Sequence, residues 1–447
     1  MKNNLPFEIV HLGALKCVTG SCHLIMSNKL NIMIDCGLAQ GESDCIPIKD
    51  WPVKPDKIDY LFVTHAHIDH IGRIPELINA GFTGEIICSH PTKELLIPML
   101  EDAMIFSNYS DKEKNQLIQT IDDLSWGFEN NISFNLKNGF SFKLGIAGHI
   151  LGSSFIHFQK SNSSVVFSGD IGSINTPILK DPDICDPCDY LVLESTYGDR
   201  LHDDRTNRIK RLADILSKCI ADKGKIFIPA FSLGRTQELI YELDVIFSET
   251  TFQKKYPELS QNIPVFVDSP LGIKITKIYS KLKDFWDMES QKKLASFDHP
   301  IDFDKLYSVS KYYEHIRLLD MKGPAIIIAG SGMCTGGRII DHLKEGLLSS
   351  KNDVFFVGYQ ATNTLGRDII RYSKRKNGYV IINEKKVPLK AKIHKLSGYS
   401  AHADQNGLID WVLKMKEKPG IIQLVHGEEK AQNVLKEKFL DLGINVK

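Results

Sequence analysis

The amino-acid sequence predicts an α/β fold, in which buried strands alternate with amphipathic helices. Three observations lead to this prediction: a composition typical of soluble globular proteins, a segment pattern that recurs along the chain, and chemically unusual residues at the ends of the predicted strands. The chain has 447 residues, of which 43% are hydrophobic and 25% are charged. This length suits about two to four structural units, and the composition excludes a disordered, collagen-like or coiled-coil protein.

The recurring segment is a short apolar run rich in β-branched residues, followed by a polar or glycine-rich turn and then by helical spacing of apolar residues. The predicted strands are, in chain order, 58–63, 164–167, 190–193, 225–228, 325–329 and 421–425. The predicted helices are 71–80, 236–247, 338–348 and a last helix from about residue 429. Alternating strands and helices indicate an α/β architecture, and ligands bind such sheets where strands end at their carboxyl edge.

Two polar and charged stretches interrupt this pattern and are candidate domain boundaries. The first lies near residues 200–205 and the second near residues 373–378. We therefore predict a first domain formed by residues 1–200 together with 379–447. Residues 201–378 are predicted to form a second α/β domain that is inserted into the first.

The charge balance and the distribution of apolar residues exclude two ways of binding partners. Lys plus Arg total 55 and Asp plus Glu total 55, so the formal net charge is zero. A protein that binds nucleic acid by its overall charge is strongly basic, so any polyanion must be held here by a local patch. No stretch approaches the roughly 18 continuous apolar residues of a membrane helix, so no membrane partner is predicted. The nine scattered cysteines are typical of reduced thiols, which predicts a cytoplasmic protein.

The strongest functional signal is the hexapeptide of residues 65–70. It contains four potential metal ligands, His65, His67, Asp69 and His70, in a turn that follows an apolar strand. Imidazole and carboxylate groups are suitable ligands for zinc. The alternative is a surface loop that happens to be rich in histidine, and four ligands at this spacing disfavour it.

Three further residues at strand ends fit the same site. His149 and Asp170 each stand in a short glycine-containing turn, and Asp35 follows an apolar run at 31–34. Taken singly, they would be a core histidine and two turn residues. Beside the hexapeptide, His149 and Asp170 are predicted to be additional metal ligands. Asp35 is predicted to accept a hydrogen bond from a ligand imidazole and so to orient it.

Together these residues resemble motifs one to four of the metallo-β-lactamase superfamily, whose fold is an αββα sandwich. The resemblance implies two Zn²⁺ ions per chain. It assigns His65, His67 and His149 to one ion, Asp69 and His70 to the other, and Asp170 to a bridging position between them. Two metal ions about 3.5–4 Å apart can stabilise both the attacking and the leaving oxygen of a phosphate displacement.

Three later segments resemble motifs A, B and C of the β-CASP nucleases, which include the nuclease subunit of the cleavage and polyadenylation machinery and its bacterial relatives. These segments are 193–200, which contains Glu194, 398–404, which contains His402, and 424–428, which contains His426. The resemblance covers nearly the whole chain and implies a β-CASP domain inserted in the sandwich. In this family a histidine at the position of His426 accompanies RNA processing, whereas the DNA-repair branch has valine. By resemblance, His426 would complete the coordination of the second ion.

The resemblance predicts a zinc-dependent ribonuclease that uses a metal-bound hydroxide and leaves 5′-phosphate products. Two zinc ions, two aspartates and one hydroxide leave about one positive charge, which suits an anionic phosphodiester. His402 would protonate the departing oxygen, and Glu194 would orient His402 and favour its charged form. Asp69, His402 and Glu194 are therefore the predicted catalytic residues. His394 lacks the motif context, and we interpret it as a strand residue.

Four residues outside these motifs are candidate RNA contacts. Ser331 and Gly332 stand in a glycine-rich turn whose backbone amides could hold a phosphate, although such turns are as often only tight corners. Arg235 and Arg367 could bind phosphate or form structural ion pairs. The basic run at 371–376 is interpreted as a solvated loop rather than as an RNA-binding patch.

The predicted partner is an RNA substrate, in single-stranded form, and three alternatives remain open. The first is a nuclease that acts on single-stranded DNA or on both nucleic acids. The second is a metallohydrolase of small esters or thioesters, which would not need Glu194, His402 or the inserted domain. The third is an RNA-binding scaffold with a degenerate site, which the intact motifs disfavour. The sequence leaves open a homodimer, and it does not distinguish internal cleavage from cleavage at an end.

Overall fold

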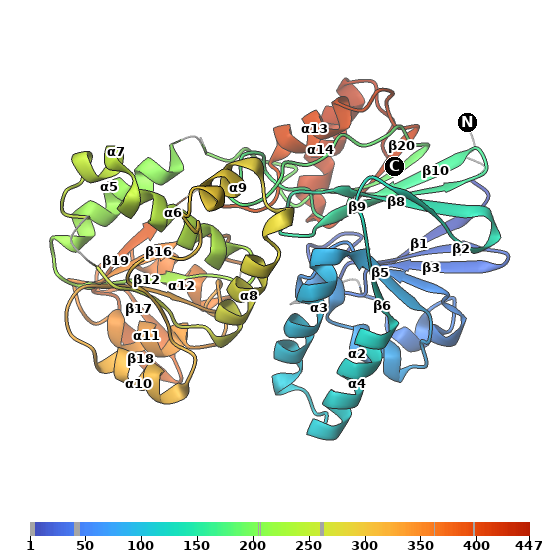
Figure 1. Ribbon diagram of the computed structural model, residues 1–447. Helices are drawn as coiled ribbons and strands as arrows, with labels where there is room; N and C mark the ends of the chain where they lie inside the picture. The colour runs from blue at the N-terminus through green and yellow to red at the C-terminus, as the bar shows by residue number, and fades with distance from the viewer. Residues whose placement is uncertain are drawn as a thin grey trace. The chain divides into compact units, whose positions relative to one another are not determined.

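The structure is a computed structural model that describes residues 5–39, 45–203, 205, 207–259, 263–361, 363–396 and 398–447. The chain divides into two compact units, Met1–Leu201 with Ala401–Lys447, and His202–Ser400 (Figure 1). Residues 379–400 belong to the second unit because β19 (Lys392–Lys395) pairs in parallel with β16 (Asp353–Phe356) of its sheet. The predicted α/β fold is confirmed.

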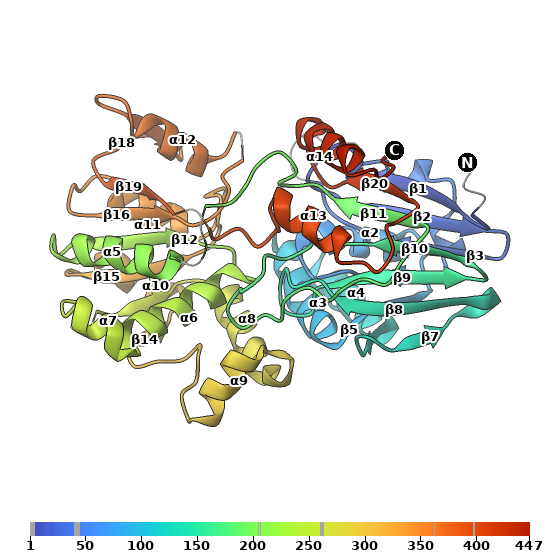
Figure 2. The same ribbon diagram turned by 90° about the horizontal axis from the view of Figure 1, so that it is seen from above.

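The first unit contains two six-stranded sheets. The first sheet follows chain order and consists of β1 (Glu8–Gly13), β2 (Cys22–Ser27), β3 (Leu30–Ile34), β4 (Tyr60–Phe62), β5 (Glu85–Ser89) and β6 (Ser125–Phe128). The second sheet has the order β20 (Ile421–Val425), β11 (Tyr190–Glu194), β10 (Ser163–Phe167), β9 (Ser154–Lys160), β8 (Phe140–Ile146) and β7 (Ser133–Asn135), which Figure 2 shows.

Helices cover the outer face of each sheet, so the first unit has four layers (Figure 1). The first sheet is covered by α2 (Ile74–Asn79), α3 (His90–Ala103) and α4 (Asp111–Leu124), and the second by α13 (Gln405–Leu413) and α14 (Glu429–Asp441). The packing of β10 on both of its faces explains why its sequence is continuously apolar. Val165 and Phe167 belong to the core that also contains side chains of the first sheet, whereas Val166 packs in a second core with side chains of α13 and α14. The predicted αββα sandwich is confirmed.

The strands that carry the sequence motifs end at the same edge of their sheets. In the first sheet, β3 pairs in parallel with β4, and in the second, β10, β11 and β20 are mutually parallel. Parallel strands bring their carboxyl ends to one edge. The residues that follow these strands are therefore brought together although they are far apart in the chain.

The second unit contains one parallel six-stranded sheet and a β-hairpin. The sheet has the order β14 (Leu306–Ser308), β13 (Val265–Val267), β15 (Ala325–Ala329), β12 (Lys225–Pro229), β16 and β19, and the hairpin is β17 (Tyr379–Ile382) with β18 (Lys385–Pro388). The helices of this unit are α5 (Arg208–Ile220), α6 (Arg235–Ser248), α7 (Thr250–Lys255), α8 (Pro270–Lys281), α9 (Met288–Ala295), α10 (Tyr312–Asp320), α11 (Ile339–Gly346) and α12 (Leu365–Tyr372). Among the described residues, no helix is both long and apolar enough to cross a membrane.

Candidate metal centre

The hexapeptide lies in the turn that follows β4 and continues into the short helix α1 (Ile68–Ile71). His67 has an extended backbone and precedes the first residue of this helix. In extended backbone, side chains two residues apart point to the same side, which places His65 beside His67. Asp69 and His70 project instead from the first turn of the helix. The four side chains therefore form two pairs with different directions.

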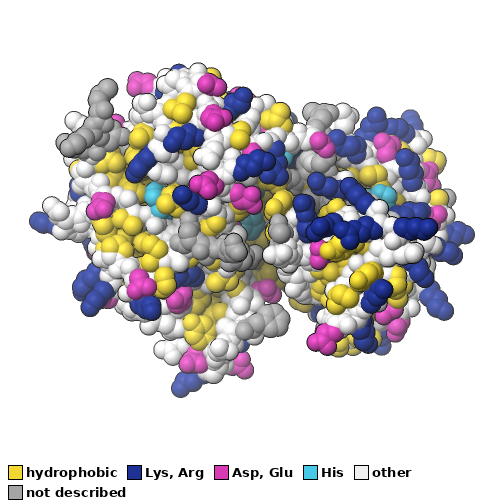
Figure 3. All heavy atoms as spheres, turned by 180° about the vertical axis from the view of Figure 1, so that it is seen from behind, with side chains coloured by type: hydrophobic (Ala, Val, Ile, Leu, Met, Phe, Trp, Pro, Cys, Tyr) yellow, Lys and Arg dark blue, Asp and Glu magenta, His cyan; other side chains and the backbone are white. Residues whose placement is uncertain are grey.

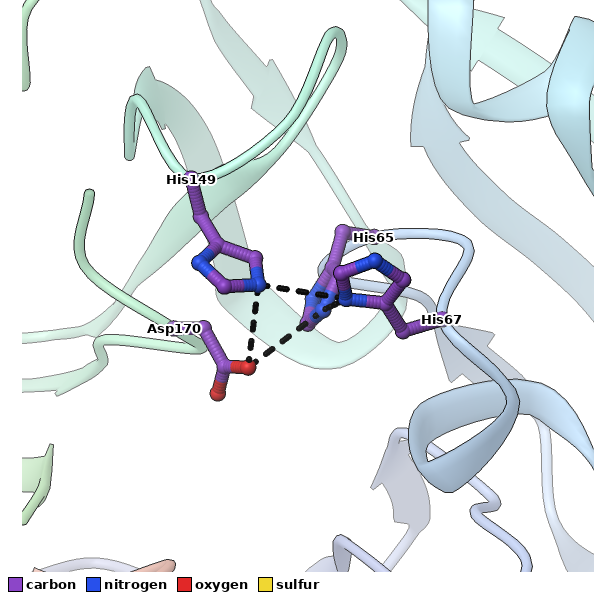
Figure 4. Close-up of side chains that lie close together, drawn as sticks. All are labelled: His65, His67, His149 and Asp170. Atoms are coloured by element: carbon purple, nitrogen blue, oxygen red, sulfur yellow. Dashed lines mark hydrogen bonds and ion pairs between the residues drawn. The ribbon is translucent and has the colours of Figure 1, made fainter. Parts of the chain in front are cut away.

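His65, His67, His149 and Asp170 converge on one point, as Figure 4 shows. The Nδ1 atom of His67 lies 3.1 Å from Nε2 of His65 and 3.1 Å from Nε2 of His149. Oδ2 of Asp170 lies 3.4 Å from Nε2 of His65 and 3.5 Å from Nε2 of His149. Three ring nitrogens and one carboxylate oxygen thus face one another in the way that ligands of a single cation do.

Asp69, His70 and His426 form a second set around the other oxygen of Asp170. Oδ1 of Asp170 lies 3.4 Å from Nε2 of His70 and 3.5 Å from Nε2 of His426. Oδ2 of Asp69 lies 3.9 Å from Nε2 of His426. One carboxylate therefore faces both sets, and every residue that the sequence predicted as a metal ligand belongs to one of them.

Several polar atoms of these two sets are buried and have no hydrogen-bond partner among the described residues. They are Oδ1 of Asp170, Nε2 of His70, Nδ1 of His149 and both ring nitrogens of His426. Buried polar atoms are almost always paired, so unpaired ones at the contact between the two sets fit the binding of a cation. The donor set of imidazoles and carboxylates fits divalent metals such as zinc.

The protonation states of the first set suit metal binding. Burial lowers the pKa of His67 to about 4 and lowers the pKa values of His65 and His149 well below their ordinary value. These imidazoles are therefore neutral at neutral pH, and a neutral imidazole is the form that binds a metal. His70 differs: burial alone would lower its pKa, but the carboxylates of Asp170 and Asp35 raise it well above the ordinary value.

Asp35 holds the ligand side chains in place from behind. Its Oδ2 lies 2.6 Å from Nδ1 of His70, and its Oδ1 accepts hydrogen bonds from the backbone amide and the hydroxyl of Thr64, at 2.8 and 3.1 Å. The same hydroxyl lies 3.1 Å from Nδ1 of His65. When the hydroxyl donates to Asp35, it accepts from the Nδ1 proton of His65, which leaves Nε2 free for a metal. The sequence did not identify Thr64, although it directly precedes the hexapeptide.

Two residues of the site adopt a left-handed backbone. The φ angle is 58° at Asp35 and 50° at His426. This conformation is uncommon outside glycine, and it persists where the surroundings enforce it. Here the amide of Asp35 donates to the carbonyl of Phe62 at 2.8 Å, and the amide of His426 donates to the carbonyl of Ala14 at 2.7 Å. The tight turns after β3 and β20 thus keep both side chains at the strand ends.

The half-buried His402 and the fully buried Glu194 form a pair beside the two ligand sets. Nδ1 of His402 lies 3.0 and 3.1 Å from the two carboxylate oxygens of Glu194, and its Nε2 lies 3.8 Å from Oδ2 of Asp170. Glu194 also accepts the backbone amide of Ile171 at 2.7 Å, which fixes the carboxylate. Burial alone would lower the pKa of His402, but the carboxylates of Glu194 and Asp170 raise it to about 9. The pair therefore keeps a proton on His402, next to the two ligand sets.

The four candidate RNA contacts belong to the second unit. Arg235 is buried, pairs with the carboxylate of Glu238 and lies over the ring of Tyr399. The hydroxyl of Ser331 accepts the amides of Thr335 and Gly336 at 2.9 and 3.3 Å, so this oxygen occupies the turn.

At Gly332, a Cβ would approach the ring of Phe231 to 2.8 Å, so glycine is needed there for close packing. Arg367 is exposed on α12. Phosphate binding by these four residues stays a prediction.

The second unit also contains a buried cluster that the sequence did not single out. Oδ2 of Asp268 lies 2.6 Å from Nδ1 of His315 and 2.6 Å from Nε2 of His342, and its Oδ1 accepts from Arg338 at 2.7 Å. The guanidinium already neutralises the carboxylate, so this cluster is a complete hydrogen-bond network rather than a cation site. It joins the end of β13 to α10 and α11.

Models of three protein families match consecutive segments of the chain. The metallo-beta-lactamase superfamily matches residues 15–230, the Beta-Casp domain matches residues 236–369, and the Zn-dependent metallo-hydrolase RNA specificity domain matches residues 386–447. The order agrees with a sandwich interrupted by an inserted domain.

This chain is similar in sequence, over nearly its whole length, to several proteins whose roles have been described. A ribonuclease of Thermus thermophilus is 33% identical over 98% of this chain and 95% of its own length. The transcription termination factor FttA of Methanocaldococcus jannaschii is 30% identical, over 94% of this chain and 67% of its own length. The cleavage and polyadenylation specificity factor 73 of Drosophila melanogaster is 29% identical, over 96% and 61%. A crystal structure of a protein of unknown function from Enterococcus faecalis shares the fold, with a TM-score of 0.56 and 12% identity over 98% of this chain and 97% of that chain.

Proposed function

This chain belongs to the metallo-β-lactamase superfamily and to its β-CASP branch of nucleases that hydrolyse RNA, and we propose on that basis that it is a two-zinc ribonuclease. The proposed substrate is single-stranded RNA, and the proposed products carry 5′-phosphates. Superfamily membership implies a metal-dependent enzyme. The number of ions, their identity and the role of each residue are part of the proposal.

The convergence of six side chains on the carboxylate of Asp170 is the observation that supports two ions. The first set offers three ring nitrogens, the second offers two ring nitrogens and the carboxylate of Asp69, and Asp170 turns one oxygen to each. With ions bound, the five ligand imidazoles would be neutral, because a metal displaces the proton from the nitrogen that it binds. Two carboxylates would then carry −2, whereas two divalent ions carry +4. The loaded site therefore keeps a positive charge that attracts a phosphodiester.

Zinc ions held in these sets would supply Lewis acidity and a nucleophile at neutral pH. The chain itself supplies orientation. Asp35 holds His70 directly and His65 through the hydroxyl of Thr64, so the ring nitrogens that face the ions are fixed before substrate arrives. Preorganised ligands of this kind avoid reorganisation during the reaction.

His402 is the proposed proton donor for the departing oxygen. Its pKa of about 9 keeps the ring charged at neutral pH, and Glu194 holds the Nδ1 proton. The second proton is on Nε2, which faces the metal sets at the position of Asp170. An alkoxide is a poor leaving group, so protonation at this atom would accelerate cleavage.

The experiment that tests this proposal uses RNA and DNA strands of matched sequence, labelled at either end. The purified protein is expected to cleave the RNA, to lose activity with a chelator and to regain it with zinc. Products are expected to be substrates for a 5′-phosphate-dependent exonuclease. Equal cleavage of the DNA strand would contradict the RNA preference. Turnover of a small thioester without any cleavage of RNA would replace the proposal with the metallohydrolase alternative.

A further inference from the structure

Residues 365–390 of the second unit carry a local excess of positive charge. They include eight Lys or Arg residues and only Asp368 and Glu384 as acids, an excess of six in a chain whose net charge is zero. All eight basic side chains are exposed. We call them the basic face, and they are Arg367, Arg371, Lys374, Arg375, Lys376, Lys385, Lys386 and Lys390. On the side that Figure 3 shows, Lys and Arg side chains gather over the second unit.

Helix α12 aligns part of the basic face in a stripe. Arg367 and Arg371 are four residues apart, and Lys374 and Arg375 follow just beyond the end of the helix. Residues four apart share one side of a helix, so Arg367 and Arg371 do. The opposite side carries Ile369, which is fully buried in the core of the second unit. The helix is thus anchored by its apolar side and presents its basic side to solvent.

The hairpin of β17 and β18 adds apolar groups to the same segment. Val380, Ile382 and Val387 point inward and join the core that contains Ile369. Because side chains alternate along a strand, Tyr379 and Ile381 point outward, with 45% and 57% of their surface exposed. Exposed aromatic and aliphatic side chains on a two-stranded hairpin are not explained by core packing.

Basic and aromatic groups are interleaved on this segment. The ammonium of Lys386 lies 4.2 Å from the centroid of the Tyr379 ring, and the guanidinium of Arg375 lies 4.7 Å from the centroid of Tyr372. Single-stranded nucleic acid is held by this combination, because cations bind its phosphates and aromatic rings stack on its bases. An acidic protein would satisfy the charges and would leave the exposed ring unused, and a duplex would keep its bases stacked inside.

We propose that the basic face, together with Tyr379, is a binding site for single-stranded RNA that is additional to the metal centre. This inference rests on the proposed function, because it takes RNA to be the substrate. It replaces the interpretation of residues 371–376 as a solvated loop, since that interpretation did not include the stripe on α12 or the outward side of the hairpin. The site lies wholly within the second unit.

The test uses the full-length protein with Lys374, Arg375, Lys385 and Lys386 replaced together by Gln. Binding of a fluorescein-labelled, unstructured RNA is measured by anisotropy in a His402→Ala background, in which cleavage is expected to be at least about 100-fold slower. Affinity is expected to fall about tenfold or more at moderate salt, and the slope of log Kd against log salt is expected to flatten by about 0.7 for each lost phosphate contact. A second variant, Tyr379→Ala, is expected to weaken RNA binding at least about fivefold with an unchanged salt slope.

The matched control replaces four other exposed lysines of the second unit, Lys254, Lys277, Lys281 and Lys283, by Gln. It is expected to retain RNA affinity. An equal loss in this control would show that only overall charge matters and would overturn the site. Binding of polyglutamate or of duplex RNA as tight as that of the single strand would also overturn it.

An RNA-cleavage assay of the unmodified protein distinguishes a failure of this inference from a failure of the proposed function. If the unmodified protein cleaves RNA and the four-residue variant binds RNA equally well, the basic face is not an RNA site while the proposed function holds. If the unmodified protein neither binds nor cleaves RNA, the proposed function itself is wrong. Circular dichroism and metal content, which are expected to be unchanged, exclude misfolding of the variants.

Discussion

Asp35 Oδ2 lies 2.6 Å from Nδ1 of His70, and both side chains are completely buried. The contact reaches from the turn after β3 to the first turn of α1, so it joins two segments that follow neighbouring strands of the first sheet. It leaves Nε2 of His70 facing Asp170 at 3.4 Å. The carboxylate of Asp35 thus determines that Nε2 of His70, and not Nδ1, is available to the ligand set.

Replacement of Asp35 by Asn is expected to weaken metal binding. Asn keeps the size of the side chain and tolerates the left-handed backbone, but it lacks the charge that holds the Nδ1 proton of His70. Loss of such a supporting contact typically lowers metal affinity about 10- to 100-fold. Competition with a chromogenic chelator measures this affinity. The exposed Asp56→Asn variant is the control, and equal affinity of both variants would contradict the role of Asp35.

Replacement of His67 by Ala is expected to remove metal and activity together. Its Nδ1 atom is central to the first ligand set, at 3.1 Å from both other ring nitrogens. Elemental analysis of the purified variant should show less zinc per chain than in the unmodified protein. His157→Ala, a change in β9 outside both ligand sets, should keep full metal content. A metal-free His67→Ala protein with full RNA cleavage would refute the metal centre.

Replacement of His402 by Ala is expected to reduce cleavage while about two zinc ions remain bound per chain. Proton donation contributes roughly 100- to 10,000-fold to rates, so kcat should fall at least about 100-fold. The measurement combines single-turnover cleavage with elemental analysis of the same sample. If zinc is lost together with activity, His402 is a ligand and not the proton donor.

Asp244 of α6 is expected to make stability depend on pH. Its side chain is 3% exposed, and burial, aided by the nearby Asp298 carboxylate, raises its pKa to about 7 from 3.8. The folded state therefore binds a proton that the unfolded state releases between these values, so stability falls as pH rises from about 4 to about 7. Asp244→Asn removes this loss.

Thermal unfolding at two pH values tests this expectation. The free energy of unfolding of the Asn variant should exceed that of the unmodified protein by more at pH 8 than at pH 5.5. The two differences should themselves differ by up to about 2 kcal/mol, since one pKa unit corresponds to about 1.4 kcal/mol. The exposed Asp284→Asn variant should show no such difference. An equal gain at both pH values would mean that Asp244 is ionised over the whole range in the folded protein.

The sequence by itself predicted the metal-ligand motif and several strands. The motif places four potential ligands within six residues, and short apolar runs mark the strands. The hexapeptide after β4 predicted its ligands without any knowledge of distant residues. Strands 190–193, 225–228 and 325–329 appear in the structure as β11, β12 and β15. The mixed arrangement of two sheets followed from resemblance and was confirmed by the fold.

Tertiary structure alone revealed which atoms meet. Thr64 has an ordinary sequence context, and its role depends on Asp35 lying behind it, 29 residues earlier in the chain. Arg235 could not be assigned from the sequence, because the position of Glu238 and Tyr399 around it depends on packing. The basic run at 371–376 became part of a proposed RNA site only because α12 and the hairpin of β17 and β18 share one core in the structure. Composition and spacing act along the chain, whereas hydrogen bonds and charge clusters depend on distances that folding sets.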